Sequence, residues 1–215
     1  GRTKILTDYL MEQLSFLDYL ITSNGAVTYD LKTGEVVCQT LLSNEKSVEI
    51  FNILKDYNLI YEIYYNGDCF MNKESYSMFD EEHVAPHIYK LLSNFIKEVP
   101  DLETLIDGNG IEKLNILTLT AEQRTLLEEK ISQSRNVAFA SSFPMTPGKN
   151  GNLEMTEANA TKGFAIKGLA DDKGHGAVGG TDEVDKIQRR LMVGNHHKGA
   201  VLVPNLVADV ASPEH

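Results

Sequence analysis

The chain has 215 residues, of which 42% are hydrophobic and 24% charged, a composition typical of a globular protein with one large or two small domains. Its 31 acidic and 20 basic residues give a formal net charge of -11, which disfavours binding to nucleic acid and to anionic membranes. The sequence has no long apolar run or signal-peptide core, and Cys38 and Cys69 lack the spacing of a zinc site or disulfide framework. We therefore expect a cytoplasmic protein that contacts neither nucleic acid nor membrane.

The first part of the chain predicts a helix, a strand and a hairpin. Apolar residues recur at helical spacing over residues 3–16, which indicates an amphipathic helix. The short apolar run 19–22 predicts a buried strand, and Asn24-Gly25 turns the chain after it. Residues 26–29 and 35–39 then flank a turn-forming loop as a β-hairpin.

The middle of the chain predicts an α+β sheet that is covered by helices on one face. Its strongest turn signal is Asn66-Gly67, which joins strands 59–65 and 68–72 as a hairpin. A capping box at residues 120–123 opens a helix that ends near Ile131. The other predicted elements are helices over 43–55 and 87–96 and strands over 111–119 and 137–141.

After the middle region, the strand-like residues 152–156 lead into a predicted helix over 160–170. Thr161 can cap this helix, and Lys162 adds a full positive charge where the helix dipole already favours anions. Most lysines in a first helical turn are solvated surface residues, so local spacing alone leaves both interpretations open.

Three short motifs stand in a suggestive order: Gly1-Arg2 before the first helix, Ser23-Asn24-Gly25-Ala26 after the first strand, and Thr161-Lys162-Gly163. Their order and separation resemble the Cof-type, class IIB branch of the haloacid dehalogenase superfamily, whose members are mostly magnesium-dependent phosphatases. The resemblance covers roughly residues 1 to 172. It implies an α/β fold in which a Rossmann-like core, residues 1–41 and 153–215, carries an inserted α+β cap domain, residues 42–152.

The same resemblance implies a set of site residues that bind or activate a phosphate. They are Lys162 as the catalytic lysine, Arg2, Asn24, Gly25 and Asn195 for substrate binding, and Asp182 and Asp185 for Mg²⁺. Two of these assignments have simpler alternatives. A purely structural role for Asn24 as a turn residue has the same weight as a role in substrate binding. Asp182 and Asp185 are three residues apart, and such pairs of carboxylates are usually solvated and bind no metal. We expect Asn24 and Lys162 to lie in one polar cleft, within reach of one small ligand, because both stand at ends of core strands.

The chain departs from the family pattern at two points. The family's nucleophile motif, Asp-x-Asp-Gly-Thr, lies before the Gly-Arg motif and is absent from this sequence, which favours a processed, trimmed or partial chain. The acidic motif Gly-Asp-x-x-Asn-Asp is expected near residues 184–189, where Asp185 alone is in register, while a shifted alignment uses Asp182 and Asp185.

Two functions therefore stay open. The first is a magnesium-dependent phosphatase that hydrolyses a small phosphorylated metabolite, such as a sugar phosphate, through an aspartyl-phosphate. The second is a non-catalytic, phosphatase-like binding or scaffold protein, which the missing nucleophile favours. An upstream Asp-x-Asp segment would decide between them, and we expect the 215-residue chain alone to be nearly inactive. The sequence indicates no oligomeric state.

Overall fold

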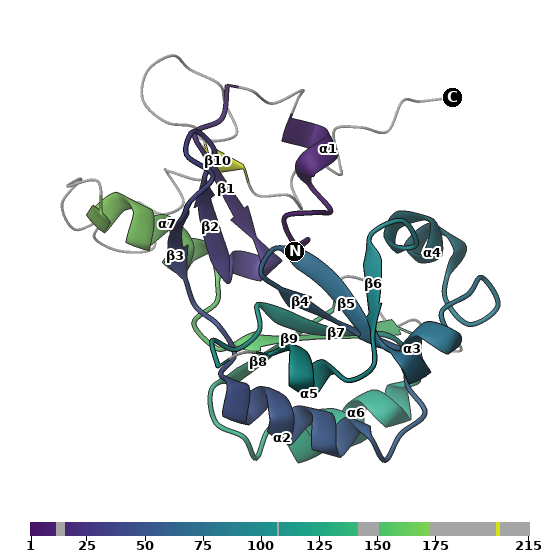
Figure 1. Cartoon of the computed structure of the whole chain (residues 1–215). Coiled ribbons are helices and arrows are strands. Elements are labelled where there is room, and N and C mark those ends of the chain that lie inside the picture. Colours follow the sequence, from purple (N-terminus) through teal and green to yellow (C-terminus); the bar gives the residue numbers. More distant parts are fainter. Residues whose placement is uncertain (12–15, 107, 142–150, 173–200, 203–215) are drawn as a thin grey trace. The chain divides into compact units, whose positions relative to one another are not determined.

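The computed structural model describes residues 1–11, 16–106, 108–141, 151–172 and 201–202 (Figure 1). The chain divides into two compact units, one formed by Gly1–Thr40 with the chain from Asn159 onward, and the other by Leu41–Ala158. The first contains a four-stranded sheet and the second a six-stranded sheet. Strands from both ends of the chain thus share the first sheet.

The first unit is built on a sheet with the strand order β10-β1-β2-β3. Its strands are β1 (Tyr19–Thr22), β2 (Val27–Asp30), β3 (Val36–Gln39) and β10 (Val201–Leu202). Strand β2 pairs antiparallel with both β1 and β3, and β10 pairs parallel with β1. The structure confirms the predicted strand at 19–22 and the hairpin that follows it.

Helix α7 (Lys162–Asp172) packs against this sheet, where Ile21 of β1 forms an apolar cluster with Ala165 and Ile166. Ile21 pairs in register with Thr28, and Thr28 with Cys38. Because directly opposite residues share a face of a sheet, all three side chains lie on the face that α7 covers. Gly168 permits this packing, since a Cβ atom there would stand 3.4 Å from the Cys38 sulfur.

The Thr28 hydroxyl is buried under this helix and finds no hydrogen-bond partner within the described residues. We expect Thr28→Val to raise the free energy of unfolding by about 1 kcal/mol, because valine keeps the shape and removes an unsatisfied polar atom. Thr22→Val is the matched control: the Thr22 hydroxyl donates to the Val27 carbonyl at 3.3 Å, so its loss should lower stability by about 1 kcal/mol. Urea unfolding measures both changes, and a destabilised Thr28→Val variant would contradict the prediction.

The first helix is shorter than predicted. Helix α1 spans Asp8–Met11, residues 5–7 form a turn, and residues 12–15 lie outside the described part of the chain. The Leu6 amide donates to the Thr3 carbonyl, and the Thr7 hydroxyl donates to the Lys4 carbonyl at 2.7 Å. Threonine side chains that bond to nearby backbone compete with helical hydrogen bonds, which explains the late start.

The second unit has a sheet with the strand order β6-β5-β4-β7-β9-β8. The strands are β4 (Tyr61–Tyr65), β5 (Asp68–Asn72), β6 (Ile96–Val99), β7 (Lys113–Leu119), β8 (Val137–Ala140) and β9 (Gly151–Glu157). Every neighbouring pair is antiparallel except β5 and β6. The Asn66-Gly67 turn joins β4 and β5 as predicted, with both residues at positive φ.

One predicted boundary differs from the structure. The sequence analysis ended the middle region at residue 152, inside β9, whereas the second unit continues to Ala158. The reason is that β9 pairs with β7 and β8, and its Leu153 and Met155 side chains are fully buried in the core of this unit. These contacts are made by residues distant in sequence.

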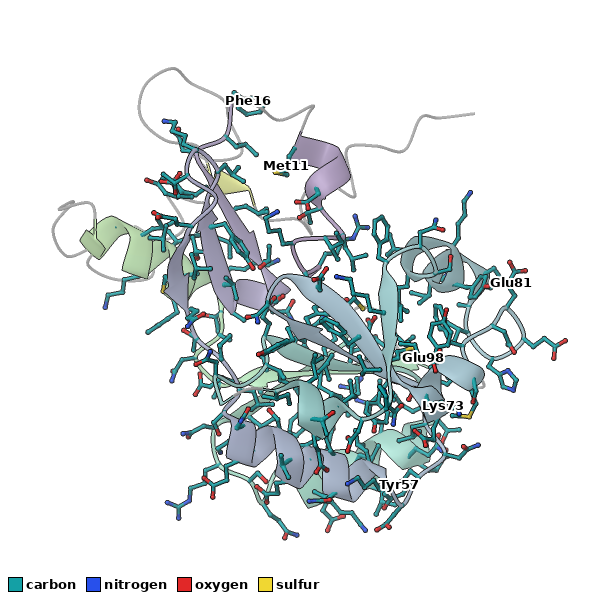
Figure 2. All side chains as sticks on the ribbon, in the orientation of Figure 1. Met11, Phe16, Tyr57, Lys73, Glu81 and Glu98 are labelled. Atoms are coloured by element: carbon teal, nitrogen blue, oxygen red, sulfur yellow. The ribbon has the colours of Figure 1, made fainter. Side chains whose placement is uncertain are left out.

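Helices α2 (Asn44–Leu54) and α6 (Ala121–Ile131) cover one face of this sheet (Figure 1). Their buried apolar side chains, with those of the strands, fill the core between the two layers (Figure 2). Ser43 caps α2, and Thr120 and Gln123 form the predicted capping box on α6, with bonds of 2.8 and 3.2 Å. Because α2 and α6 both lie on one face of the sheet, the structure confirms the predicted α+β sheet covered by helices on one face.

Several short elements were not predicted. They are α3 (Lys73–Ser77), α5 (Leu102–Leu105), β6 and β10. Helix α4 (Pro86–Leu92) ends earlier than the predicted helix over 87–96. Strand β6 alternates weakly in hydrophobicity, and its pairing with β5 defines it. No helix in the described ranges is long and apolar enough to cross a membrane.

Candidate active site

The candidate site begins where β1 ends, in a short 3-10 turn formed by Ser23–Gly25. All three residues of this turn have positive φ: 49° at Ser23, 66° at Asn24 and 112° at Gly25. Positive φ is uncommon for residues other than glycine, and consecutive examples persist only where the surrounding structure imposes them. Such strained backbone clusters at functional sites, so the turn is a candidate on geometry as well as on its motif.

The Gly1-Arg2 segment packs directly against this turn. The Ser23 amide donates to the Arg2 carbonyl at 2.8 Å. A Cβ atom on Gly1 would collide with the backbone nitrogen and the side-chain oxygen of Asn24, so glycine allows the close approach. Arg2 and Asn24 are half-buried, whereas Ser23 is fully buried. The first two sequence motifs are therefore neighbours in space.

The third motif also packs against this turn. A Cβ atom on Gly25 would collide with the Thr161 carbonyl group and would lie 2.7 Å from the Lys162 backbone nitrogen. Thr161 caps helix α7, because its hydroxyl accepts a hydrogen bond from the Phe164 amide at 3.1 Å. The turn thus lies against the first residue of α7, the half-buried Lys162.

This arrangement favours an anionic ligand. The N-terminus of a helix presents backbone N–H groups and the positive end of the helix dipole. Lys162 and Arg2 belong to segments that contact one turn, so two cationic residues and an asparagine stand close together in the first unit. Backbone amides, lysine, arginine and asparagine are the groups that proteins use to hold phosphate.

Three predicted site residues, Asp182, Asp185 and Asn195, lie outside the described residues. In the part of the chain that the structure does describe, no group of three or more His, Cys, Asp or Glu side chains could hold a metal ion. The described residues therefore contain no such cluster, and the two carboxylates assigned to Mg²⁺ lie outside them. Ser23 was not among the predicted site residues, because its backbone conformation has no signature in the sequence.

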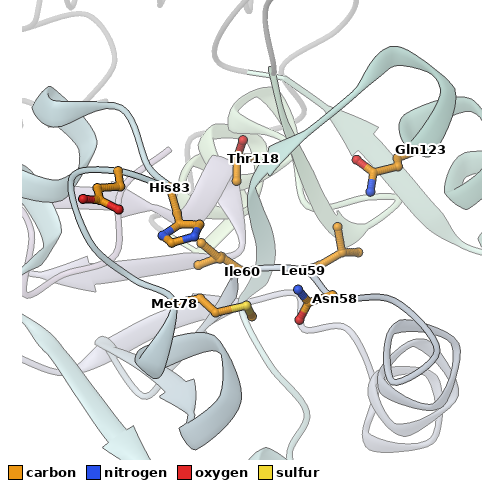
Figure 3. Close-up of a pocket in the computed structure, with 8 residues that line it drawn as sticks. Asn58, Leu59, Ile60, Met78, His83, Thr118 and Gln123 are labelled. Atoms are coloured by element: carbon orange, nitrogen blue, oxygen red, sulfur yellow. The ribbon is translucent and has the colours of Figure 1, made fainter.

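The second unit contains a cavity of about 330 Å³ (Figure 3). Its lining includes Asn58, Ile60, Met78, His83 and Thr118. The His83 Nδ1 atom lies 2.7 Å from the Asp80 carboxylate, whose pKa is lowered mainly by this hydrogen bond. His83 is more than half exposed, and the cavity lining includes no residue of the Gly1-Arg2, Ser23–Ala26 or Thr161–Gly163 motifs.

The comparison with known families agrees with the arrangement of the motifs. The family model of haloacid dehalogenase-like hydrolases matches residues 1–176, most of the chain. The chain belongs to this hydrolase family. The family match confirms the resemblance drawn from the motifs, and it covers all three of them.

Solved structures of haloacid dehalogenase hydrolases share this fold. A protein of Thermotoga maritima is 23% identical with a TM-score of 0.61, over 81% of this chain and 61% of its own. A subclass IIB sugar phosphatase is 16% identical with a TM-score of 0.61, over 81% of this chain and 60% of its own. A Cof-like hydrolase of Plasmodium vivax is 16% identical with a TM-score of 0.57, over the same shares.

These likenesses show that the fold is that of the haloacid dehalogenase hydrolases, with a Rossmann-like α/β core, and that it is shared with Cof-type and subclass IIB members. The chain spans less than two thirds of the length of these solved relatives.

Proposed function

We propose that this protein is a magnesium-dependent phosphatase that acts on a small phosphorylated metabolite, such as a sugar phosphate. The observation that supports it most is the packing of the Ser23–Gly25 turn between Gly1-Arg2 and the start of α7 at Lys162. The fold shared with a subclass IIB sugar phosphatase supports the substrate class. In this proposal the second unit, Leu41–Ala158, is the cap domain.

Lys162 has the central role in this proposal. Its ammonium group would neutralise charge on the equatorial oxygens of the transferring phosphoryl group, and the α7 backbone amides would add to that effect. Arg2 and Asn24 would bind substrate oxygens, and Gly25 would keep the turn close to α7. Mg²⁺ bound by Asp182 and Asp185 would supply further charge neutralisation, and Asn195 would contact substrate.

The covalent step needs a carboxylate nucleophile, and the sequence contains no Asp-x-Asp-Gly-Thr motif. In the proposed reaction an aspartate from an upstream segment attacks phosphorus, the bond from phosphorus to the leaving oxygen breaks, and a second aspartate donates a proton to that oxygen. Water then hydrolyses the aspartyl-phosphate and releases inorganic phosphate. The alternative, a non-catalytic binding or scaffold protein, is favoured if no such segment exists.

The test compares two forms of the protein, the 215-residue chain and a form extended at its N-terminus by an encoded Asp-x-Asp segment. We expect the extended form to hydrolyse p-nitrophenyl phosphate with Mg²⁺, to lose that activity in excess chelator and to regain it when Mg²⁺ is restored. The 215-residue chain should be nearly inactive, because the loss of the nucleophile closes the covalent route. Strong magnesium-dependent turnover by the short chain, or none by the extended form, would overturn the proposal.

A further inference from the structure

The six-stranded sheet has polar side chains on the face opposite its helices. Alternate residues of β4, β7 and β9 belong to the apolar core beneath α2 and α6, so the residues between them point the other way. Those polar residues and a cysteine of β5 form what we call the polar cluster: Glu62, Tyr64, Cys69, Lys113, Asn115, Asn152 and Glu154. All seven are buried, with exposed fractions of 7% or less. Polar groups buried to this degree must satisfy one another.

Glu62 lies at the centre of the cluster. Its Oε1 atom accepts hydrogen bonds from the Asn115 amide at 2.9 Å and from the Tyr64 hydroxyl at 3.1 Å. Its Oε2 atom lies 2.7 Å from the Cys69 sulfur, which donates to it. These three direct partners are neutral groups, so none of them offsets a full negative charge on Glu62.

Glu154 has a different environment. Its Oε2 atom lies 3.3 Å from the Lys113 ammonium nitrogen, which also stands 4.5 Å from the centre of the Tyr64 ring. The Asn152 amide connects the two halves of the cluster, donating to Asn115 at 3.1 Å and to Glu154 at 3.4 Å. The polar cluster as defined thus contains two carboxyl groups and one ammonium group, and the ammonium group is paired with Glu154.

We propose that the polar cluster is a proton-dependent switch, in which neutral Glu62 holds strands β4, β5 and β7 together and ionised Glu62 loosens them and exposes Cys69. The geometry requires one of the two buried carboxyls to be neutral, since an uncompensated buried charge is far more costly than a hydrogen bond. Glu62 is that carboxyl because Lys113 pairs with Glu154. Tyr64 and Cys69 can each reverse their hydrogen bond and accept the Glu62 proton.

The charges around Glu62 agree with this assignment. Burial raises the pKa of Glu62, opposed by the hydrogen bonds from Cys69, Asn115 and Tyr64 and by the charge of Lys113. Burial, then the charge of Glu62, raises the pKa of Tyr64 and of Cys69 well above their usual ranges, so both stay protonated. Among the described residues, the titratable groups facing Glu62 are Tyr64 on its own strand, Cys69 on β5, Lys113 on β7 and Glu154 on β9.

The stability of the fold depends on pH because folding changes the pKa of Glu62. A carboxyl whose pKa is raised by folding contributes stability that is fully present below its ordinary value of 4.5 and is lost as pH rises through the folded value. The protein should therefore weaken from mildly acidic to alkaline pH. Glu62→Gln keeps an acceptor for Asn115 and Tyr64 and cannot ionise, so it should abolish this dependence.

The experiment measures the rate at which a thiol reagent labels Cys69 from pH 6 to pH 9, with Cys38 replaced by serine in every protein. Labelling takes place in an opened state in which Cys69 is exposed to solvent, and there thiolate formation accelerates the reaction equally in both proteins. Each wild-type rate is therefore divided by the Glu62→Gln rate at the same pH, so that the ratio reports opening. We expect this ratio to rise by about tenfold or more between pH 6 and pH 9. A shift of one unit in the pKa of Glu62 on folding would change the opening equilibrium by about that factor. A ratio that stays constant across the range would overturn the switch.

A second measurement needs no variant at Glu62. Carboxyl ¹³C shifts of the otherwise unaltered protein, with Glu62 assigned, report its titration directly. We expect Glu62 to titrate above its ordinary value of 4.5 and Cys69 labelling to rise over the same pH interval. Titration of Glu62 at its ordinary value would overturn the proposal, and so would titration without any change in labelling. Neither result depends on phosphatase activity.

Discussion

Replacing Lys162 by alanine is expected to lower kcat/KM for p-nitrophenyl phosphate by at least about a hundredfold in the N-terminally extended form. That is the scale observed when one charge-stabilising group is removed from a polar transition state. Lys162 is the first residue of α7 and lies against the Ser23–Gly25 turn, so its charge adds to that of the helix terminus. Steady-state kinetics at saturating Mg²⁺ measure the loss.

Lys167 is the matched control for this variant, because it lies in the same helix and is exposed. Lys167→Ala removes an equal charge from α7 and should leave kcat/KM within about twofold, as expected for a solvated surface residue. Circular dichroism of both variants checks that the fold is retained. Equal activity of the two alanine variants would show that Lys162 has no role in the chemistry.

Replacing Gly25 by alanine is expected to lower the free energy of unfolding by about 3 kcal/mol or more. Two costs combine at this position. The φ of 112° is strained for any residue with a Cβ atom, and that atom would collide with the Thr161 carbonyl group. The colliding atoms of Thr161 and Lys162 are backbone atoms, which cannot rotate away as a side chain can. The collision could be relieved only if the start of α7 moved away from the turn. Urea unfolding measures the loss, and activity should fall with it in the extended form.

Gly34→Ala is the control that distinguishes the cost of the positive φ from the cost of the collision. It also has a positive φ, 77°, but a Cβ atom there would meet nothing within 4 Å. Gly34→Ala should therefore lower stability by only about 1 kcal/mol, the cost of the left-handed conformation alone. If the two variants proved equally unstable, the close approach of Gly25 to α7 would not be important for the fold.

Much of the secondary structure was predicted from short sequence motifs. The Asn66-Gly67 turn, the Thr120–Gln123 capping box and the Thr161 cap were all identified from a few adjacent residues, and the structure contains each of them. Such features depend on hydrogen bonds between positions at most four apart, so their chemistry can be read from a short stretch of sequence. Short elements without such signals, for example β6, were missed.

For the candidate site, the sequence supplied the residue types and their order, and the family match supports that order. The sequence could not show that Ser23 and Asn24 both adopt positive φ, since tertiary packing imposes that conformation. Nor could it show how closely Gly1 and Gly25 approach their neighbours. The assigned roles of Lys162, Arg2, Asn24 and Gly25 remain proposals that the kinetic variants test.

The sequence by itself thus determined the family, the turns and caps, and the strands with clear patterns, because these follow from local chemistry and from motifs in order. Only the tertiary structure decided that β9 joins the second sheet and that Glu62, Lys113 and Glu154 share one buried cluster. Alternating polar residues in those strands are typical of a solvated face, yet all of them are buried. Burial and pairing between distant residues depend on the whole packed chain, and these are what set the charge state of Glu62.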